Sequence, residues 1–147
     1  MTIPDFLRES NAIEGIHREP SEAEILAMTE FLQLEKLDTK SVLKLQAVFA
    51  PGKPLRTEVD MNVRVGNHIP PYGGPGIELG LIENLSQANF GKHPLDVHKH
   101  FEILHPFMDG NGRTGRAIWL WQMRRQFGND KLSFLHRWYY QTLERAR

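Results

Sequence analysis

The chain contains no cysteine among its 147 residues. This absence excludes disulfides, thiolate nucleophiles and zinc sites built on thiolates. The chain also has no excess of charge of either sign, because 18 lysines and arginines balance 18 aspartates and glutamates. A protein that works mainly on nucleic acid is expected to carry a basic surface. We therefore predict that nucleic acid is not a partner.

Long apolar runs are missing as well. The first ten residues include the charged side chains of Asp5, Arg8 and Glu9, which suit neither a signal peptide nor a membrane span. We therefore expect no membrane partner and, by default, a cytoplasmic location. The apolar fraction of 40% and the length of the chain fit one globular domain over residues 1–147.

The spacing of apolar residues predicts an all-α fold, a compact helical bundle. Pro4 suits a first helical turn and Gly15 suits a helix end, so we expect a short helix at about residues 4–14. Ser21 and Asp38 occupy positions typical of helix N-caps before the next two amphipathic stretches. Further helices are expected within residues 77–85, 95–104, 113–123 and 132–143. The third of these stretches is apolar nearly all round, which indicates a central buried helix.

The stretch at about residues 56–72 differs from the rest because it is rich in proline and glycine. Within it, Val63 and Val65 alternate with Arg64, and the pair Gly66-Asn67 supplies turn chemistry. We predict a short β-hairpin flap here. A long segment without helix inside a compact domain is more often functional than idle.

The densest chemistry lies in the run HPFMDGNGRTGR, residues 105–116. Its glycines allow successive backbone N–H groups to point at one anion. A helix beginning at Arg113 would aim its own N–H groups and its dipole at the same point. Arg113 and Arg116 are three residues apart, so both guanidinium groups can reach one face and bind phosphate. The run therefore predicts a phosphate-binding site.

Two further side chains of this run suit catalysis on a phosphate. Asp109 is placed to hold a magnesium ion that bridges phosphate oxygens. His105 is the natural acceptor for the proton of an attacking hydroxyl. Taken singly, the histidine would be a surface residue and the aspartate part of a turn, but their combination with the arginines favours a functional site.

Three glycines of the run also fit the dinucleotide-binding pattern G-x-G-x-x-G: Gly110, Gly112 and Gly115. That pattern requires a preceding strand and a βαβ unit. The residues before the run have a helical pattern instead, and the chain has no series of buried strands. We therefore reject a dinucleotide-binding fold.

The run from His105 to Arg116 matches at every position the signature HPFx(D/E)GNGRxxR and resembles the Fic family. The stretch LRTEVDMNVRVGNHIPP, residues 55–71, is similar to the flap of that family. FLHRWYYQTL, residues 134–143, is similar to its closing helix. The resemblance implies the Fic fold with a flap over the active site. It also implies a magnesium-dependent protein adenylyltransferase, which moves AMP from ATP to a serine, threonine or tyrosine hydroxyl and releases pyrophosphate.

The resemblance assigns a role to each residue of the run. His105 would be the general base, Phe107 would anchor the loop in the core, and Asp109 would bind Mg²⁺. Arg113 would hold the phosphate chain and Arg116 would contact the γ-phosphate. The α- and β-phosphates would be cradled by Gly110, Asn111 and Gly112.

The segment Ser10 to Gly15 resembles the inhibitory motif (S/T)xxxE(G/N) of the same family, in the arrangement that precedes the catalytic core. Ser10 and Glu14 are four residues apart and hence on one face of the expected helix. A carboxylate near a helix C-terminus is electrostatically unfavourable, so a partner such as Arg116 would explain Glu14. We predict that Ser10 and Glu14 inhibit the enzyme.

The flap would bind the backbone of the target protein as an added strand, through Val63, Arg64 and Val65. The family also often uses homodimers to regulate inhibition. Three other functions are alternatives: phosphate transfer with the nucleotide reversed, removal of AMP by water that Glu14 positions, and a non-enzymatic interaction module. The intact signature argues for AMP transfer over the first and the third of these, and removal of AMP stays open as an alternative.

Overall fold

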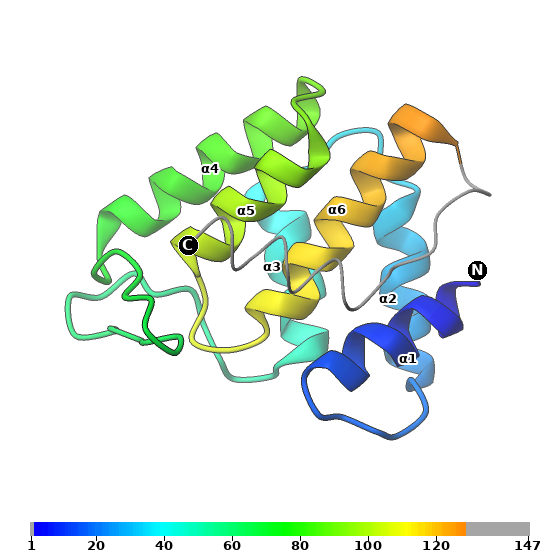
Figure 1. Ribbon diagram of the computed structural model, residues 1–147, viewed down its shortest axis with the longest axis horizontal. Coiled ribbons are helices and arrows are strands. Elements are labelled where there is room, and N and C mark those ends of the chain that lie inside the picture. Colours follow the sequence, from blue (N-terminus) through cyan, green and yellow to red (C-terminus); the bar gives the residue numbers. More distant parts are fainter. Residues whose placement is uncertain (1, 129–147) are drawn as a thin grey trace.

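The computed structural model describes residues 2–128 of the chain. Regular structure within these residues is helical (Figure 1). The helices are α1 (Ile3–Ile13), α2 (Glu22–Leu32), α3 (Thr39–Phe49), α4 (Pro75–Asn89), α5 (Pro94–Leu104) and α6 (Asn111–Phe127). The expected all-α class is confirmed for this part of the chain. The helix expected at 132–143 and the stretch that resembles a closing helix lie outside the described residues.

Helix starts follow the capping signals in the sequence. The Ser21 hydroxyl accepts the N–H of Glu24, and the Glu24 carboxylate accepts the N–H of Ser21, which closes a capping box at α2. Asp38 and Ser41 form the same arrangement at α3. Both predicted N-caps are therefore confirmed. Helix α1 begins at Ile3 after a Thr2 cap and ends at Ile13, one residue earlier at each end than expected.

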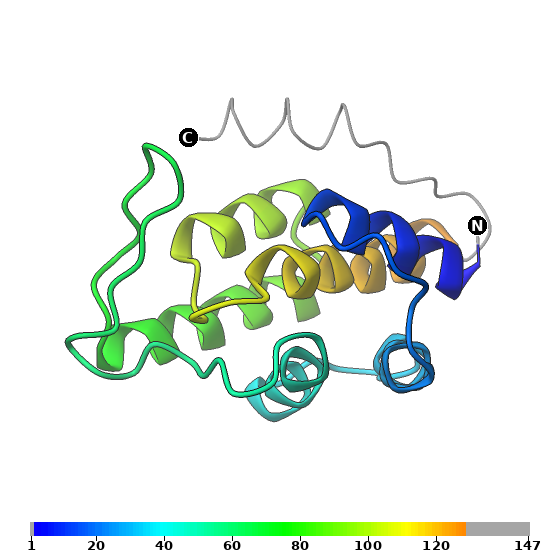
Figure 2. The same cartoon turned by 90° about the horizontal axis from the view of Figure 1, so that it is seen from below.

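Helix α6 is the centre of the bundle. It contacts each of the other described helices, and Ala117, Ile118 and Trp121 are buried in the core (Figures 1 and 2). The expectation of a central buried helix is thus confirmed. The helix begins at Asn111 rather than at Arg113, because Gly110 takes a left-handed φ of 80° as its N-cap and turns the chain two residues earlier.

The flap segment does not show the expected β-hairpin. Between residues 56 and 72 the backbone forms one antiparallel bridge, in which Val65 and His68 exchange N–H to carbonyl hydrogen bonds of 2.9 Å. Pro70 and Pro71 lack an N–H group, so they cannot extend this ladder. The segment projects from one end of the bundle, beside the start of α4 (Figure 2).

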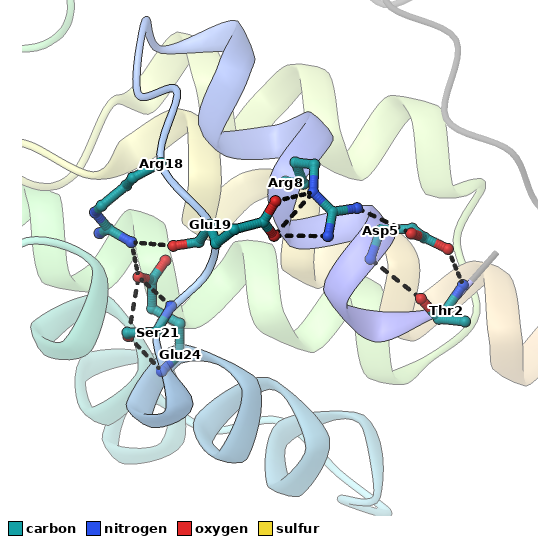
Figure 3. A network of polar contacts seen from close by, with 7 residues as sticks. All are labelled: Thr2, Asp5, Arg8, Arg18, Glu19, Ser21 and Glu24. Carbon is teal, nitrogen blue, oxygen red and sulfur yellow. Dashed lines mark hydrogen bonds and ion pairs between the residues drawn. The ribbon is translucent and has the colours of Figure 1, made fainter.

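Helix α1 is attached to α2 through Glu24, whose side chain is 2% exposed. This carboxylate accepts hydrogen bonds from Asn11 of α1, at 3.1 Å, and from Arg18 of the connecting loop, at 2.6 Å. Figure 3 shows the Arg18 contact together with the more exposed ion pair of Arg8 with Glu19, which ties the same loop to α1. Burial favours a raised pKa for Glu24, but the hydrogen bonds from Asn11, Arg18 and Ser21 hold the pKa below its usual value.

Replacing this carboxylate should weaken the attachment of α1. Glu24→Gln should lower the free energy of unfolding at pH 7 by about 1–3 kcal/mol, because the buried amide of Asn11 and the guanidinium of Arg18 lose a charged acceptor. The pKa of Glu24 is lowered in the folded state, so its contribution is present above the unfolded pKa of about 4.3 and is lost as the pH falls through the folded value.

Urea unfolding at several pH values provides the measurement. The difference between the wild type and Glu24→Gln should shrink as the pH falls from 7 toward 3. Glu22→Gln is the matched control, since Glu22 lies in the same helical turn but is exposed. A difference that stays constant with pH would show that Glu24 does not act through its charge.

Candidate active site

His105 stands directly after α5, in an unusual backbone conformation. Its φ of 49° makes it the single non-glycine residue with positive φ in the part of the chain that the structure describes. Its N–H donates to the carbonyl of Phe101 and so terminates the helix. The left-handed turn directs the chain away from α5 into the glycine-rich loop. A histidine in this conformation is strained by about 1 kcal/mol or more, so the surrounding contacts must hold it.

The loop from Phe107 to Asn111 is closed by one buried side chain. The Asn111 amide accepts the N–H of Phe107 and donates to its carbonyl, both at 2.8 Å. Phe107 is fully buried in the core, as the resemblance implied. Gln46 of α3 donates to the carbonyl of Asp109 at 3.0 Å. Because the Asn111 side chain is used within the loop, its contact with a phosphate would come from its backbone.

The start of α6 has the character of an anion-binding site. Its N-cap, Gly110, has no side chain that could satisfy the first N–H groups. Arg113 is buried over the Phe49 ring, and its Nε has no hydrogen-bond partner among residues 2–128. Burial lowers the pKa of Arg113, and the charges of Asp109, Glu14 and Glu24 partly oppose this shift. A cation with an unsatisfied buried donor fits a phosphate ligand.

Arg116 is bound by the end of α1. Its Nη2 donates to the Glu14 carboxylate at 2.7 Å and to the Ser10 carbonyl at 3.0 Å, and its Nε donates to the Ser10 hydroxyl at 2.7 Å. The Arg116 side chain is 1% exposed and that of Glu14 is 39% exposed. The structure thus brings together the residues of the inhibitory motif and the last arginine of the signature.

The Glu14 carboxylate lies against the first turn of α6. A Cβ atom at Gly112 would collide with this carboxylate and would stand 2.9 Å from Arg116 Nη1. Only a residue without a side chain leaves room for an anion at this place. The first turn of a helix is where phosphate groups commonly bind. The carboxylate of Glu14 therefore occupies a position suited to a phosphate.

Asp109 fits a magnesium ion that is held mainly by a nucleotide. Its side chain is exposed, and one of its oxygens accepts the N–H of Gly110 at 2.7 Å. No group of three histidine, aspartate or glutamate side chains suited to a metal occurs in the part of the chain that is described. Mg²⁺ often needs only one or two carboxylates together with phosphate oxygens and water. A single carboxylate beside the phosphate cradle satisfies that requirement.

The predicted target-binding residues lie on the projecting flap. Val63 and Val65 are half-buried, and Arg64 is exposed and donates to the Gly66 carbonyl at 2.8 Å. His68 of the same segment donates to the Ile103 carbonyl at 2.9 Å. The flap is therefore attached to the last turn of α5, directly before His105.

The chain that carries this site matches the model of a known protein family. The family model described as "Fic/DOC family" matches residues 21–123, which is more than half of the chain. The chain belongs to the Fic/DOC family. The matched region contains the whole signature from His105 to Arg116, whereas α1 precedes it. The contact between Arg116 and Glu14 thus joins the family domain to a helix outside the match.

Curated relatives of this Fic/DOC chain carry the name protein adenylyltransferase Fic. The proteins from Drosophila persimilis and Drosophila melanogaster are each 37% identical over 65 residues, and that from Drosophila grimshawi is 40% identical over 67 residues. Each match covers 38% of this chain but only 12 to 13% of the relative. The chain therefore corresponds to a small part of these longer proteins.

The sequence did not single out two residues that shape the Fic/DOC site. Arg56 is fully buried against the turn at His105, and Gln46 holds the backbone of Asp109. Gln46 belongs to neither an apolar stripe nor the signature. Arg56 lies in the stretch that resembles the flap, but nothing in the sequence distinguished it from the other residues there. None of the helices within residues 2–128 is long and apolar enough to cross a membrane.

A side chain at Gly112 should displace Glu14 from Arg116. Gly112→Ala would place a methyl group where the Glu14 carboxylate lies, and the flexible glutamate is the group that can move. Loss of one partly exposed ion pair should destabilise the end of α1 locally by about 1 kcal/mol. Hydrogen exchange measured over residues 10–16 should accelerate accordingly.

Gly76→Ala is the matched control, because a Cβ at Gly76 in α4 meets no atom within 4 Å. Equal exchange over residues 10–16 in Gly112→Ala and Gly76→Ala would show that Glu14 does not depend on the space above Gly112.

Proposed function

We propose that the chain transfers AMP from ATP to a serine, threonine or tyrosine hydroxyl of a target protein and releases pyrophosphate. The observation that carries this proposal is the position of Glu14. A carboxylate lies on the first turn of α6 and pairs with the buried guanidinium of Arg116, as a phosphate would. The names of the curated relatives support the same reaction.

In this proposal the signature residues bind ATP. The backbone N–H groups of Gly110, Asn111 and Gly112 hold the α- and β-phosphates at the N-terminus of α6. Arg113 neutralises the phosphate chain and Arg116 contacts the γ-phosphate. Asp109 would hold a magnesium ion, which neutralises charge on the phosphate oxygens when it is bound.

His105 is the general base of the proposed reaction. Its imidazole accepts the proton of the target hydroxyl, whose oxygen then forms a bond to the α-phosphorus. The bond from the α-phosphorus to the bridging oxygen breaks, and pyrophosphate leaves with the electron pair. The contacts that hold the left-handed turn at His105 keep the base in place before the target arrives.

The flap presents the target in this reaction. The turn closed by Val65 and His68 is the part of the flap that already has β geometry. A target segment could pair with Val63, Arg64 and Val65 by main-chain hydrogen bonds. It would then form an added strand beside this part of the flap. Its hydroxyl would then lie near His105, because His68 attaches the flap to α5.

Glu14 inhibits this reaction in the resting chain. While Arg116 is bound to Glu14 and Ser10, it is not available to the γ-phosphate. ATP can still bind to the rest of the cradle, but its phosphates are displaced from in-line attack. A displacement of about 1 Å can reduce the rate by ~10²-fold.

Three variants test the proposal by labelling with ATP that carries a tag on the α-phosphate. Glu14→Gly should raise the rate of labelling by ~10²-fold, because the γ-phosphate gains Arg116. The double variant Glu14→Gly/Arg116→Ala should lose this gain. Glu14→Gly/His105→Ala should label ~10²–10⁴-fold more slowly than Glu14→Gly, the usual effect of removing a general base.

The controls are thermal unfolding and ATP binding of each variant. If folded Glu14→Gly labels no faster than the wild type, Glu14 is not inhibitory. If the His105→Ala variant labels as fast as its parent while it binds ATP, the role of His105 in the proposal is wrong.

A further inference from the structure

Arg56 is a buried arginine at the base of the flap. Its side chain is 0% exposed. All of its side-chain hydrogen bonds go to backbone carbonyls. Nε donates to His105 at 2.7 Å and Nη2 to Leu104 at 2.9 Å, while Nη1 donates to both Met61, at 3.1 Å, and Pro71, at 2.9 Å. One planar group thus binds the end of α5 on one side and both limbs of the flap on the other.

No carboxylate compensates the charge of Arg56 within residues 2–128. Burial alone lowers the pKa of its guanidinium. The partners that replace water are carbonyl oxygens, including those at the negative end of the α5 dipole. Burying a cation without an anion costs free energy, and an apolar residue of similar volume would destabilise the fold less. The geometry of these hydrogen bonds is therefore the useful property of Arg56.

The backbone around Arg56 strengthens the same connection. Its N–H donates to the carbonyl of Pro106, and its carbonyl accepts the N–H of Gly74 at the end of the flap, both at 2.9 Å. His68 adds a parallel contact, because its ring donates to the Ile103 carbonyl. Three successive carbonyls at the end of α5, those of residues 103, 104 and 105, are thus bound by side chains of the flap segment.

We propose that Arg56 is a positioning residue that fixes the separation between His105 and the flap, so that a hydroxyl bound by the flap meets the base. This inference rests on the proposed transfer of AMP to a protein. In the proposed function ATP is bound by the loop at residues 105–116, whereas Arg56 is buried and its donors are used by backbone carbonyls. Arg56 therefore governs the rate of transfer to protein but not the affinity for nucleotide.

Lysine cannot replace Arg56 in this role. It retains the positive charge and much of the length, but a single ammonium group lacks the planar fork that reaches opposite sides at once. If only the charge or the packing of Arg56 were needed, lysine could replace it. If the planar arrangement of several donors is needed, lysine cannot replace it.

The experiment uses the full chain with Glu14→Gly as the parent, and adds Arg56→Lys or His68→Ala to it. Calorimetry measures the affinity for α,β-methylene ATP, in which the bond to be cleaved is blocked. Labelling from α-tagged ATP at saturating concentration measures transfer to the protein. Arg125→Lys is the matched control, because Arg125 is an exposed arginine that donates to the Leu34 carbonyl far from the signature.

Arg56→Lys should slow labelling by ~10²-fold and leave the dissociation constant of the analogue within about twofold of the parent. His68→Ala, at a half-buried position that tolerates truncation, should show the same separation with a loss of about tenfold. Arg125→Lys should change neither quantity.

Equal labelling by the parent, Arg56→Lys and His68→Ala would overturn the positioning role. A parallel loss of analogue affinity and labelling in both variants would also overturn it, since Arg56 would then be structural. A parent that binds the analogue but transfers no α-label would contradict AMP transfer itself, and is recognised before any Arg56 variant is compared.

Discussion

A guanidinium group removed from water must be surrounded by oxygen atoms, and this constraint shapes the whole site. Three arginines are buried: Arg56 at the base of the flap, and Arg113 and Arg116 in the first two turns of α6. Arg56 is satisfied by backbone carbonyls, and Arg116 by Ser10 and Glu14 of α1. Arg113 retains a buried Nε without a partner among the residues described. Without a ligand, the positive charge and the N–H donors of these arginines are therefore only partly compensated. An anion with several oxygens would supply the missing acceptors.

The proposed competition between Glu14 and a nucleotide follows from the same requirement. Arg116 is inaccessible to water, so releasing Glu14 without a replacement anion would leave a buried charge uncompensated. Glu14 is itself partly exposed, so its own desolvation is incomplete and a better anion can displace it. Helix α1 is held by Glu24 through Asn11, independently of Arg116. Under the proposed inhibition, a substitution of Glu14 would therefore free Arg116 while the helix stays attached to α2.

The parts of the fold that follow local rules could be predicted from the sequence. Ser21 and Asp38 cap helices because their side chains satisfy backbone donors within three residues, and such contacts depend only on neighbouring residues. The pairing of Glu14 with Arg116 was also expected, from the unfavourable place of a carboxylate at a helix end. The start of α6 was misplaced by two residues, because the left-handed turn at Gly110 is not distinguished by composition.

Features that depend on contacts between residues distant in the sequence could not be predicted from it. Arg56 is an ordinary charged residue in the sequence, and only the folded chain surrounds it with carbonyls from residues 5 to 49 positions away. The β-hairpin was expected from the alternation of Val63 and Val65, but an isolated turn has no neighbouring strand to support a longer ladder. The pairing of the flap with a strand of the bound target is part of the proposal.

The most direct measurement compares ATP tagged on the α-phosphate with ATP tagged on the γ-phosphate, using the folded Glu14→Gly chain in the presence of Mg²⁺. We expect that the α-tag becomes covalently attached to protein, that the γ-tag does not, and that one pyrophosphate is released for each label attached. Attachment of the γ-tag instead would mean that the chain is a phosphotransferase. Release of AMP from previously labelled protein, with no net attachment from ATP, would mean that it removes AMP.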